Sequence, residues 1–138
     1  MFKYIDVHGF ACVLHYIEFD LIVLHVYAFH IYLCCPNETW APEYVSELMP
    51  QFKDKITGMA MNVPVANGSC VDLTTEMNTM PSIDEVNEAF RIASENELKD
   101  LIGYTEDPIV SSDAIGSGNT MVFDTKATMI ASNKLLKT

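Results

Sequence analysis

The stretch that decides the fold is KDKITGMAMNVPVANGSCVDLT, residues 53–74. Its first half, residues 55–64, predicts a strand, and residues 69–77 predict a second strand because they are rich in Val, Leu and Thr. Between them, Asn67-Gly68 is a turn signal, since both residue types tolerate positive φ. We therefore expect two strands with a short connection.

The stretch SIDEVNEAFRIASEN, residues 82–96, predicts a helix. Ser82 and Glu85 have the spacing of a capping box, and acidic residues in the first turn favour the positive end of the helix dipole. The apolar residues that share one helical face, and that we expect to pack against a sheet, are Ile83, Val86, Ala89, Phe90 and Ala93. Glu85 and Glu88 are expected on the solvated face.

The flanking segments predict shorter elements. Residues 44–49 have helical spacing and precede Pro50, so we expect a short amphipathic helix there. Short strands are expected at 101–105, 109–115, 121–123, 127–130 and from 135 onward, with a turn at Asp107-Pro108. Strands joined by short hairpins, with few helices, predict an α+β fold in which helices cover one face of a largely antiparallel sheet.

Composition limits the function classes. The chain has 138 residues, enough for one domain with an ordinary core, and a net charge of −11. Only eight Lys and Arg residues are present. Because phosphate contacts depend on such residues, nucleic acid is not an expected partner.

Residues 1–35 differ from the rest, since they are hydrophobic and contain all four histidines. Three interpretations stay open: a membrane-associated helix over residues 7–35, a core-packing helix or strand, or a segment unrelated to the domain. The longest run without charged residues, 21–37, is shorter than the 18 or more expected of a spanning helix, so a membrane partner is not favoured. Two prolines and the only Trp in 36–42 mark a boundary, which divides the chain into a hydrophobic leader, 1–42, and a domain, 43–138.

Histidines and cysteines offer candidate site residues. The histidines are His8, His15, His25 and His30, and Glu18 would share a helical face with His15. A metal site needs three or four convergent ligands, and the spacing matches no metal motif, so no metal is expected. The cysteines are Cys12, Cys34, Cys35 and Cys70, which form no C-x-x-C pair and favour a reducing, cytoplasmic setting. We expect Cys70 to be a buried structural residue.

One set of motifs carries a family resemblance over residues 44–138, about two thirds of the chain. The motifs are KITGMAM (55–61), Val63-Pro64, VDLT (71–74), GYTED (103–107), VSSD (110–113) and Phe123-Asp124. In this order and spacing they resemble the C-terminal, catalytic domain of glyceraldehyde-3-phosphate dehydrogenase. The resemblance implies an α+β domain whose exposed sheet face takes part in tetramer assembly, and a parent enzyme of glycolysis that uses NAD or NADP.

The same resemblance implies chemistry whose residues are missing here. The family's nucleophilic Cys lies in an S-C-T-T-N segment, a later His lowers its pKa, and a G-x-G-x-x-G domain binds the dinucleotide. None of these patterns occurs in this sequence, and every His precedes the matched region. Asn62 stands where the family usually has a phosphate-binding Arg, and it can donate a hydrogen bond but brings no charge.

The expected function is therefore that of a partial catalytic domain, inactive alone and binding no NAD or NADP, with no catalytic residue of its own. The parent's substrate is glyceraldehyde 3-phosphate or, in related enzymes, erythrose 4-phosphate. Two alternatives stay open. One is a non-catalytic module that pairs through its sheet face with a second copy or a full-length homologue, and the other is a small membrane-associated protein.

Overall fold

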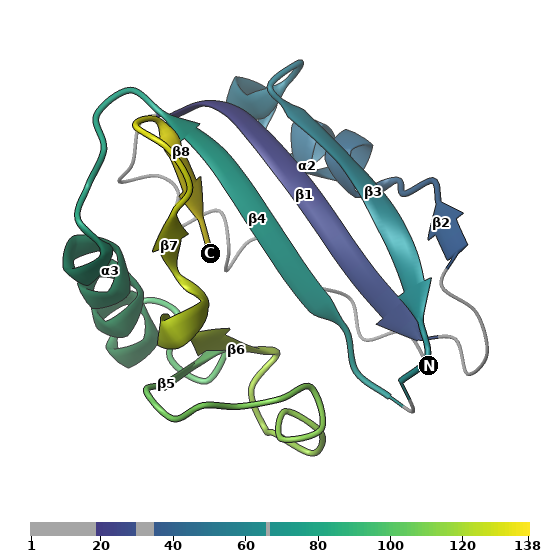
Figure 1. Ribbon diagram of the computed structural model, residues 1–138, viewed down its shortest axis with the longest axis vertical. Helices are drawn as coiled ribbons and strands as arrows, with labels where there is room; N and C mark the ends of the chain where they lie inside the picture. Colours follow the sequence, from purple (N-terminus) through teal and green to yellow (C-terminus); the bar gives the residue numbers. More distant parts are fainter. Residues whose placement is uncertain (1–18, 30–34, 66) are drawn as a thin grey trace.

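The described residues form a six-stranded sheet, a two-stranded sheet and two α-helices (Figure 1). This computed structural model describes residues 19–29, 35–65 and 67–138, with side chains from residue 36 onward. The larger sheet has the order β2-β3-β1-β4-β8-β7, and the smaller pairs β5 with β6. The strands are β1 (Phe19–Phe29), β2 (Cys35–Asn37), β3 (Ile56–Val63), β4 (Cys70–Met77), β5 (Ile102–Thr105), β6 (Met121–Asp124), β7 (Met129–Ile130) and β8 (Leu135–Lys137).

Most strand pairs are antiparallel. Within the larger sheet, only the β1–β3 pair is parallel. The α+β class with a largely antiparallel sheet is therefore confirmed. The predicted positions of β3, β4, β5 and β6 are each correct to within a residue or two.

The helices are α2 (Ala41–Leu48) and α3 (Ile83–Glu95), with short 3₁₀ segments η1 (Pro50–Phe52) and η2 (Thr125–Ala127). The predicted capping box of α3 is present. The Ser82 side chain accepts a hydrogen bond from the Glu85 amide at 3.2 Å, and the Glu85 carboxylate accepts one from the Ser82 amide at 2.8 Å. These two bonds satisfy N–H groups that a helix start otherwise leaves without partners.

A central strand comes from the hydrophobic N-terminal segment. β1 lies between β3 and β4, parallel to the first and antiparallel to the second (Figure 1). Consequently β3 and β4 run in opposite directions but do not form the hairpin that the Asn-Gly signal suggested. Residues 19–29 of this segment form a strand of the larger sheet, and the three interpretations of the segment stay predictions. The domain boundary between residues 42 and 43 stays a prediction.

One hydrophobic core holds the helices against the sheet. Alternate residues of β4, Leu73, Thr75 and Met77, are buried. They belong with side chains of η1 and α3 to a cluster composed of Met49, Phe52, Leu73, Met77, Val86, Phe90, Leu98, Ile102, Phe123 and Leu136. Since η1 and α3 contribute to the same cluster as this face of β4, the expectation of helices on one face is confirmed.

The apolar face of α3 is buried in its middle and exposed at its start. Val86 and Phe90 are buried and Ala93 packs against the core, as predicted. Ile83 is 37% exposed, so its predicted burial is wrong. It lies on the first turn of the helix, outside the core cluster.

The predicted strand at 109–115 is also wrong. Successive turns occupy this segment, and the Val110 amide donates to the Asp113 carboxylate at 2.8 Å. Val110 is 64% exposed, so its β-branched side chain does not belong to a buried strand. The predicted strand at 127–130 is shortened to β7, because η2 occupies residues 125–127.

Candidate functional site

Asn62, the predicted phosphate-binding residue, lies in β3. The register places it opposite Cys35 of β2 and opposite Ala28 of β1. Asn62 is half-buried. Its amide group can donate a hydrogen bond but supplies no charge for a phosphate, so its role stays a prediction.

Cys70 is an exposed free thiol at the start of β4. The expectation that it is buried is wrong, because the buried residues of β4 are the odd-numbered ones from Leu73 and Cys70 belongs to the other face. Partial desolvation, with the negative charge of Asp72 nearby, raises the pKa of the Cys70 thiol. A raised pKa lowers the fraction of reactive thiolate at neutral pH.

An ion pair joins β4 to β8 on this side of the sheet. Lys137 Nζ lies 3.0 Å from Asp72 Oδ2, and the Asp72 side chain is only 15% exposed. Asp72 Oδ1 is buried without a hydrogen-bond partner. No short-range pattern predicts this pair, because its members meet only when β8 docks beside β4.

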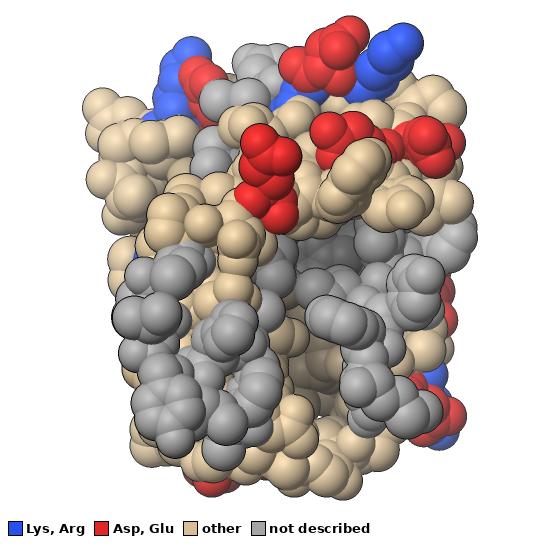
Figure 2. Space-filling view, turned by 90° about the vertical axis from the view of Figure 1, so that its right-hand side faces the viewer, with Lys and Arg blue, Asp and Glu red and all other residues tan. Residues whose placement is uncertain are grey.

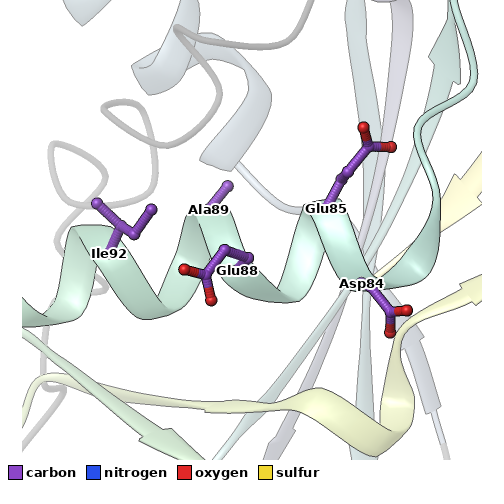
Figure 3. A pocket seen from close by; sticks show the side chains of 5 residues that line it. All are labelled: Asp84, Glu85, Glu88, Ala89 and Ile92. Carbon is purple, nitrogen blue, oxygen red and sulfur yellow. The ribbon is translucent and has the colours of Figure 1, made fainter.

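A first open depression in the described part of the chain lies along α3 (Figure 3). Its volume is about 440 Å³, and the described residues that line it are Asp84, Glu85, Glu88, Ala89 and Ile92. Figure 3 shows all five side chains projecting from the one helix. The three carboxylates lie toward the start of the helix, and Ala89 and Ile92 supply the apolar part of the depression.

The second depression lies where α3 meets the smaller sheet. Its volume is about 420 Å³, and the residues that line it are Asp84, Asn87, Glu88, Tyr104, Glu106, Thr125 and Lys126. Asn87 Nδ2 donates to the Thr125 carbonyl at 3.3 Å, and Thr125 Oγ1 donates to the Thr105 carbonyl at 3.0 Å. These bonds fix the helix to β5 and η2.

Electrostatics make both depressions poor sites for phosphate. Arg91, the cation of α3, is already held by Glu88 and Glu95, with 2.7 Å from its Nη1 to Glu95 Oε1. Hydrogen bonds from Arg91 lower the pKa of Glu88. Desolvation, and to a smaller extent the negative charge of Glu106, raises the pKa of Tyr104. Three carboxylates against Lys126 give the second depression a negative balance, which repels phosphorylated substrates.

The described residues also do not fit a dinucleotide or a metal. A pyrophosphate needs a glycine-rich helix start, whereas the first turn of α3 carries Asp84 and Glu85. Side chains of this helix start already accept hydrogen bonds from the Ser82 and Glu85 amides. Within residues 36–65 and 67–138, no three His, Cys, Asp or Glu side chains gather as a metal site would require. His8, His15, Glu18, His30, Cys12 and Cys34 lie outside the described residues, and of His25 and Cys35 only the backbone is described.

Charges on the face turned to the viewer in Figure 2 collect mainly toward one end. There, basic and acidic side chains lie side by side, while much of the described surface below them carries neither charge. No helix in the described part of the chain is both long enough and apolar enough to cross a membrane.

Fold and motifs together define the class of this chain. The sequence model of the glyceraldehyde 3-phosphate dehydrogenase C-terminal domain matches residues 32–138. The chain therefore belongs to this family, and the resemblance inferred from its motifs is confirmed. This match begins at residue 32, whereas the motifs had placed the start of the resemblance near Tyr44.

Individual relatives of this chain are glyceraldehyde-3-phosphate dehydrogenases. The chain is 42% identical over 102 residues to a glyceraldehyde-3-phosphate dehydrogenase of Eremothecium gossypii, covering 74% of this chain and 31% of that protein. Its identity to the glyceraldehyde-3-phosphate dehydrogenase of Colletotrichum lindemuthianum is 42%, over 74% of this chain and 30% of that protein. Its identity to glyceraldehyde-3-phosphate dehydrogenase 2 of Saccharomyces cerevisiae is 40%, over 74% of this chain and 31% of that protein. The chain thus spans about a third of the length of these relatives.

Proposed function

We propose that this chain is a glyceraldehyde-3-phosphate dehydrogenase-like catalytic-domain unit that does not carry out the oxidation on its own. The observation that carries the proposal is the family match over residues 32–138 combined with the state of Cys70. Phosphorylating oxidation of an aldehyde needs a thiolate that attacks the carbonyl and a base beside it. Cys70, the one thiol whose side chain is described, is exposed and has a raised pKa.

The reaction type, cofactor, location and oligomeric state in this proposal are those of the parent enzyme. It is an oxidoreductase step of glycolysis that uses NAD or NADP, performed in the cytoplasm by a tetramer. We infer that neither dinucleotide binds to this chain alone, because the acidic start of α3 repels a pyrophosphate. Asn62 keeps a hydrogen-bond donor at the family's phosphate position without its charge.

A steady-state assay tests this proposal. The purified chain is mixed with glyceraldehyde 3-phosphate, inorganic phosphate and NAD or NADP, with the yeast relative as positive control. We expect absorbance from the reduced cofactor only with the yeast protein. Reduction by this chain that disappears in a Cys70→Ser variant would contradict the proposal.

A second candidate function is pairing with a full-length homologue or a second copy. β7 is an edge strand of the larger sheet, and Met129 and Ile130 on it are 47% and 43% exposed. An edge strand presents unpaired backbone groups, and exposed apolar side chains beside it favour association.

Co-purification tests the pairing. Tagged full-length dehydrogenase should retain this chain, and Ile130→Lys should abolish the retention. Val110→Lys, which charges an exposed Val outside the sheets, is the matched control and should leave it unchanged. Equal retention of the wild type and Ile130→Lys, or none of either, would exclude association through β7.

A further inference from the structure

The connection between β3 and β4 contains a chemically special dipeptide. Asn67-Gly68 is the only Asn-Gly pair in the sequence. Both residues are exposed. Neither the sheet nor the α3 depressions use them, so the function proposed above leaves them without a role.

The side chain of Asn67 lies against the backbone nitrogen of the next residue. The Gly68 amide donates a hydrogen bond to Asn67 Oδ1 at 2.8 Å. A carbonyl bond is about 1.2 Å long, so this nitrogen lies within about 4 Å of the Asn67 Cγ carbon. That carbon is the electrophilic centre of the side-chain amide.

Gly68 leaves its nitrogen open to reaction. Its φ of +89° is a left-handed conformation that glycine adopts without strain. A Cβ built on it would meet only the Ser111 carbonyl oxygen, at 3.6 Å. Because glycine lacks this Cβ, nothing on its own side chain crowds the approach of the nitrogen to Asn67.

We propose that Asn67-Gly68 is a site of spontaneous deamidation that proceeds through a succinimide. Hydroxide removes the proton from the Gly68 nitrogen, whose electron pair then forms a bond to Asn67 Cγ. The Cγ–Nδ2 bond breaks, and the leaving NH2 group takes one proton from water and departs as ammonia, which restores the hydroxide. The product at this stage is a five-membered imide ring.

Water then opens the ring at one of its two carbonyls. Opening at the Cγ–N bond gives aspartate, and opening at the main-chain carbonyl gives isoaspartate, in which the backbone runs through the side chain. The net reaction consumes water and releases ammonia, with no oxidation or reduction. Either product adds a negative charge to a chain whose net charge is already −11, and isoaspartate also lengthens the connection beside Ser111.

Peptide mapping of the aged, full-length chain tests the proposal. The chain is incubated in mildly alkaline and mildly acidic buffers, digested and examined by mass spectrometry, with isoaspartate detected by an isoaspartyl-specific methyltransferase. We expect the peptide containing Asn67 to convert to two products of equal mass, aspartyl and isoaspartyl, and to convert faster in the alkaline buffer. Asn78, which is exposed and followed by Thr79, is the internal comparison and should convert more slowly.

Two variants separate the proposed chemistry from general ageing. Asn67→Ser removes the electrophilic carbon and should eliminate the methyl-accepting site, whereas Asn78→Ser should leave it unchanged. Gly68→Ala keeps the carbonyl and crowds the nitrogen, so it should slow the conversion. Conversion of Asn67 no faster than Asn78, or an aspartyl product without isoaspartate, would overturn the proposal.

Discussion

Two aromatic rings form a stacked contact between α3 and the smaller sheet. Phe90 and Phe123 stack with ring centroids 3.8 Å apart and ring planes 10° from parallel. Both side chains are buried in the single core cluster. Stacked rings contribute beyond the area they bury, so this contact ties α3 to β6.

Removal of one ring should destabilise the domain strongly. Phe123→Ala leaves a cavity against Phe90, and we expect it to lower the free energy of unfolding by about 3–5 kcal/mol. Denaturant titration followed by circular dichroism measures the loss. Val122→Ala, on the opposite face of the same strand, should cost much less, and equal losses would contradict this account of the core.

At the same scale, the exposure of Cys70 could have been foreseen and that of Val110 could not. Asp72 and Glu76 alternate with Leu73, Thr75 and Met77, which indicates that even-numbered residues of β4 face away from the core. Cys70 shares that parity. The segment 109–115, by contrast, contains the β-branched residues Ile109, Val110 and Ile115, which are typical of a strand. Its turns include a hydrogen bond from the Val110 amide to the Asp113 side chain.

The best-defined element is α3, whose start is set by side chains of its own. Ser82→Ala removes the hydroxyl that accepts from the Glu85 amide. We expect a loss of about 1 kcal/mol in the free energy of unfolding. Ser94→Ala is the matched control in the same helix, because the Ser94 hydroxyl only donates to the Arg91 carbonyl, and it should change stability little.

Acidification should weaken the same element. Hydrogen bonds from Ser82 lower the pKa of Glu85 below its ordinary value of 4.5. A carboxylate with a lowered folded-state pKa stabilises the fold above its unfolded-state pKa, and this stabilisation is lost as pH falls through the folded-state value. Thermal unfolding measured from neutral to acidic pH should therefore show a smaller decrease in Tm for Glu85→Gln than for the wild type.

A neutralised carboxylate outside the helix is the control for that pH series. Glu97→Gln changes an exposed residue beyond the end of α3 and should keep the pH dependence of the wild type. A flattened dependence in Glu97→Gln but not in Glu85→Gln would contradict the role given to the capping box.

Elements were predictable from sequence where local signals agree. The capping box and 3.6-residue periodicity identify α3, and strand-forming residues between turn signals identify β3 and β4. The pairing of these strands was not predictable, because a segment distant in sequence separates them in the sheet. An Asn-Gly turn signal describes local backbone preference and carries no information about an inserted strand.

At the scale of the whole molecule, the N-terminal segment completes the larger sheet. β1 pairs with β3 over residues 22–29 and with β4 over residues 19–27. Residues 19–29 show no clean alternation of polar and apolar residues, and their place in the sheet depends on pairing with strands that are distant in sequence. The Asp72–Lys137 ion pair was even harder to predict from sequence, because it forms only in the assembled sheet.

Amide hydrogen exchange tests whether β1 is a central strand of the larger sheet. Amides of residues 22–27, which lie in the stretch paired on both sides, should exchange as slowly as those of β4. Amides of the 111–116 turns provide the fast-exchanging comparison within the same sample. Fast exchange throughout β1 with slow exchange in β4 would contradict its central position.

The chain belongs to the glyceraldehyde 3-phosphate dehydrogenase C-terminal domain family, and we propose that it lacks the chemistry of the whole enzyme. A single-turnover experiment tests this proposal. The full chain, at a concentration comparable to the cofactor, is mixed with glyceraldehyde 3-phosphate and NAD or NADP without phosphate. Cofactor reduction and the intact mass of the protein are recorded in the same sample. We expect no reduced cofactor and no acyl group on the protein, whereas an acyl adduct on Cys70 with an equal amount of reduced cofactor would overturn the proposal.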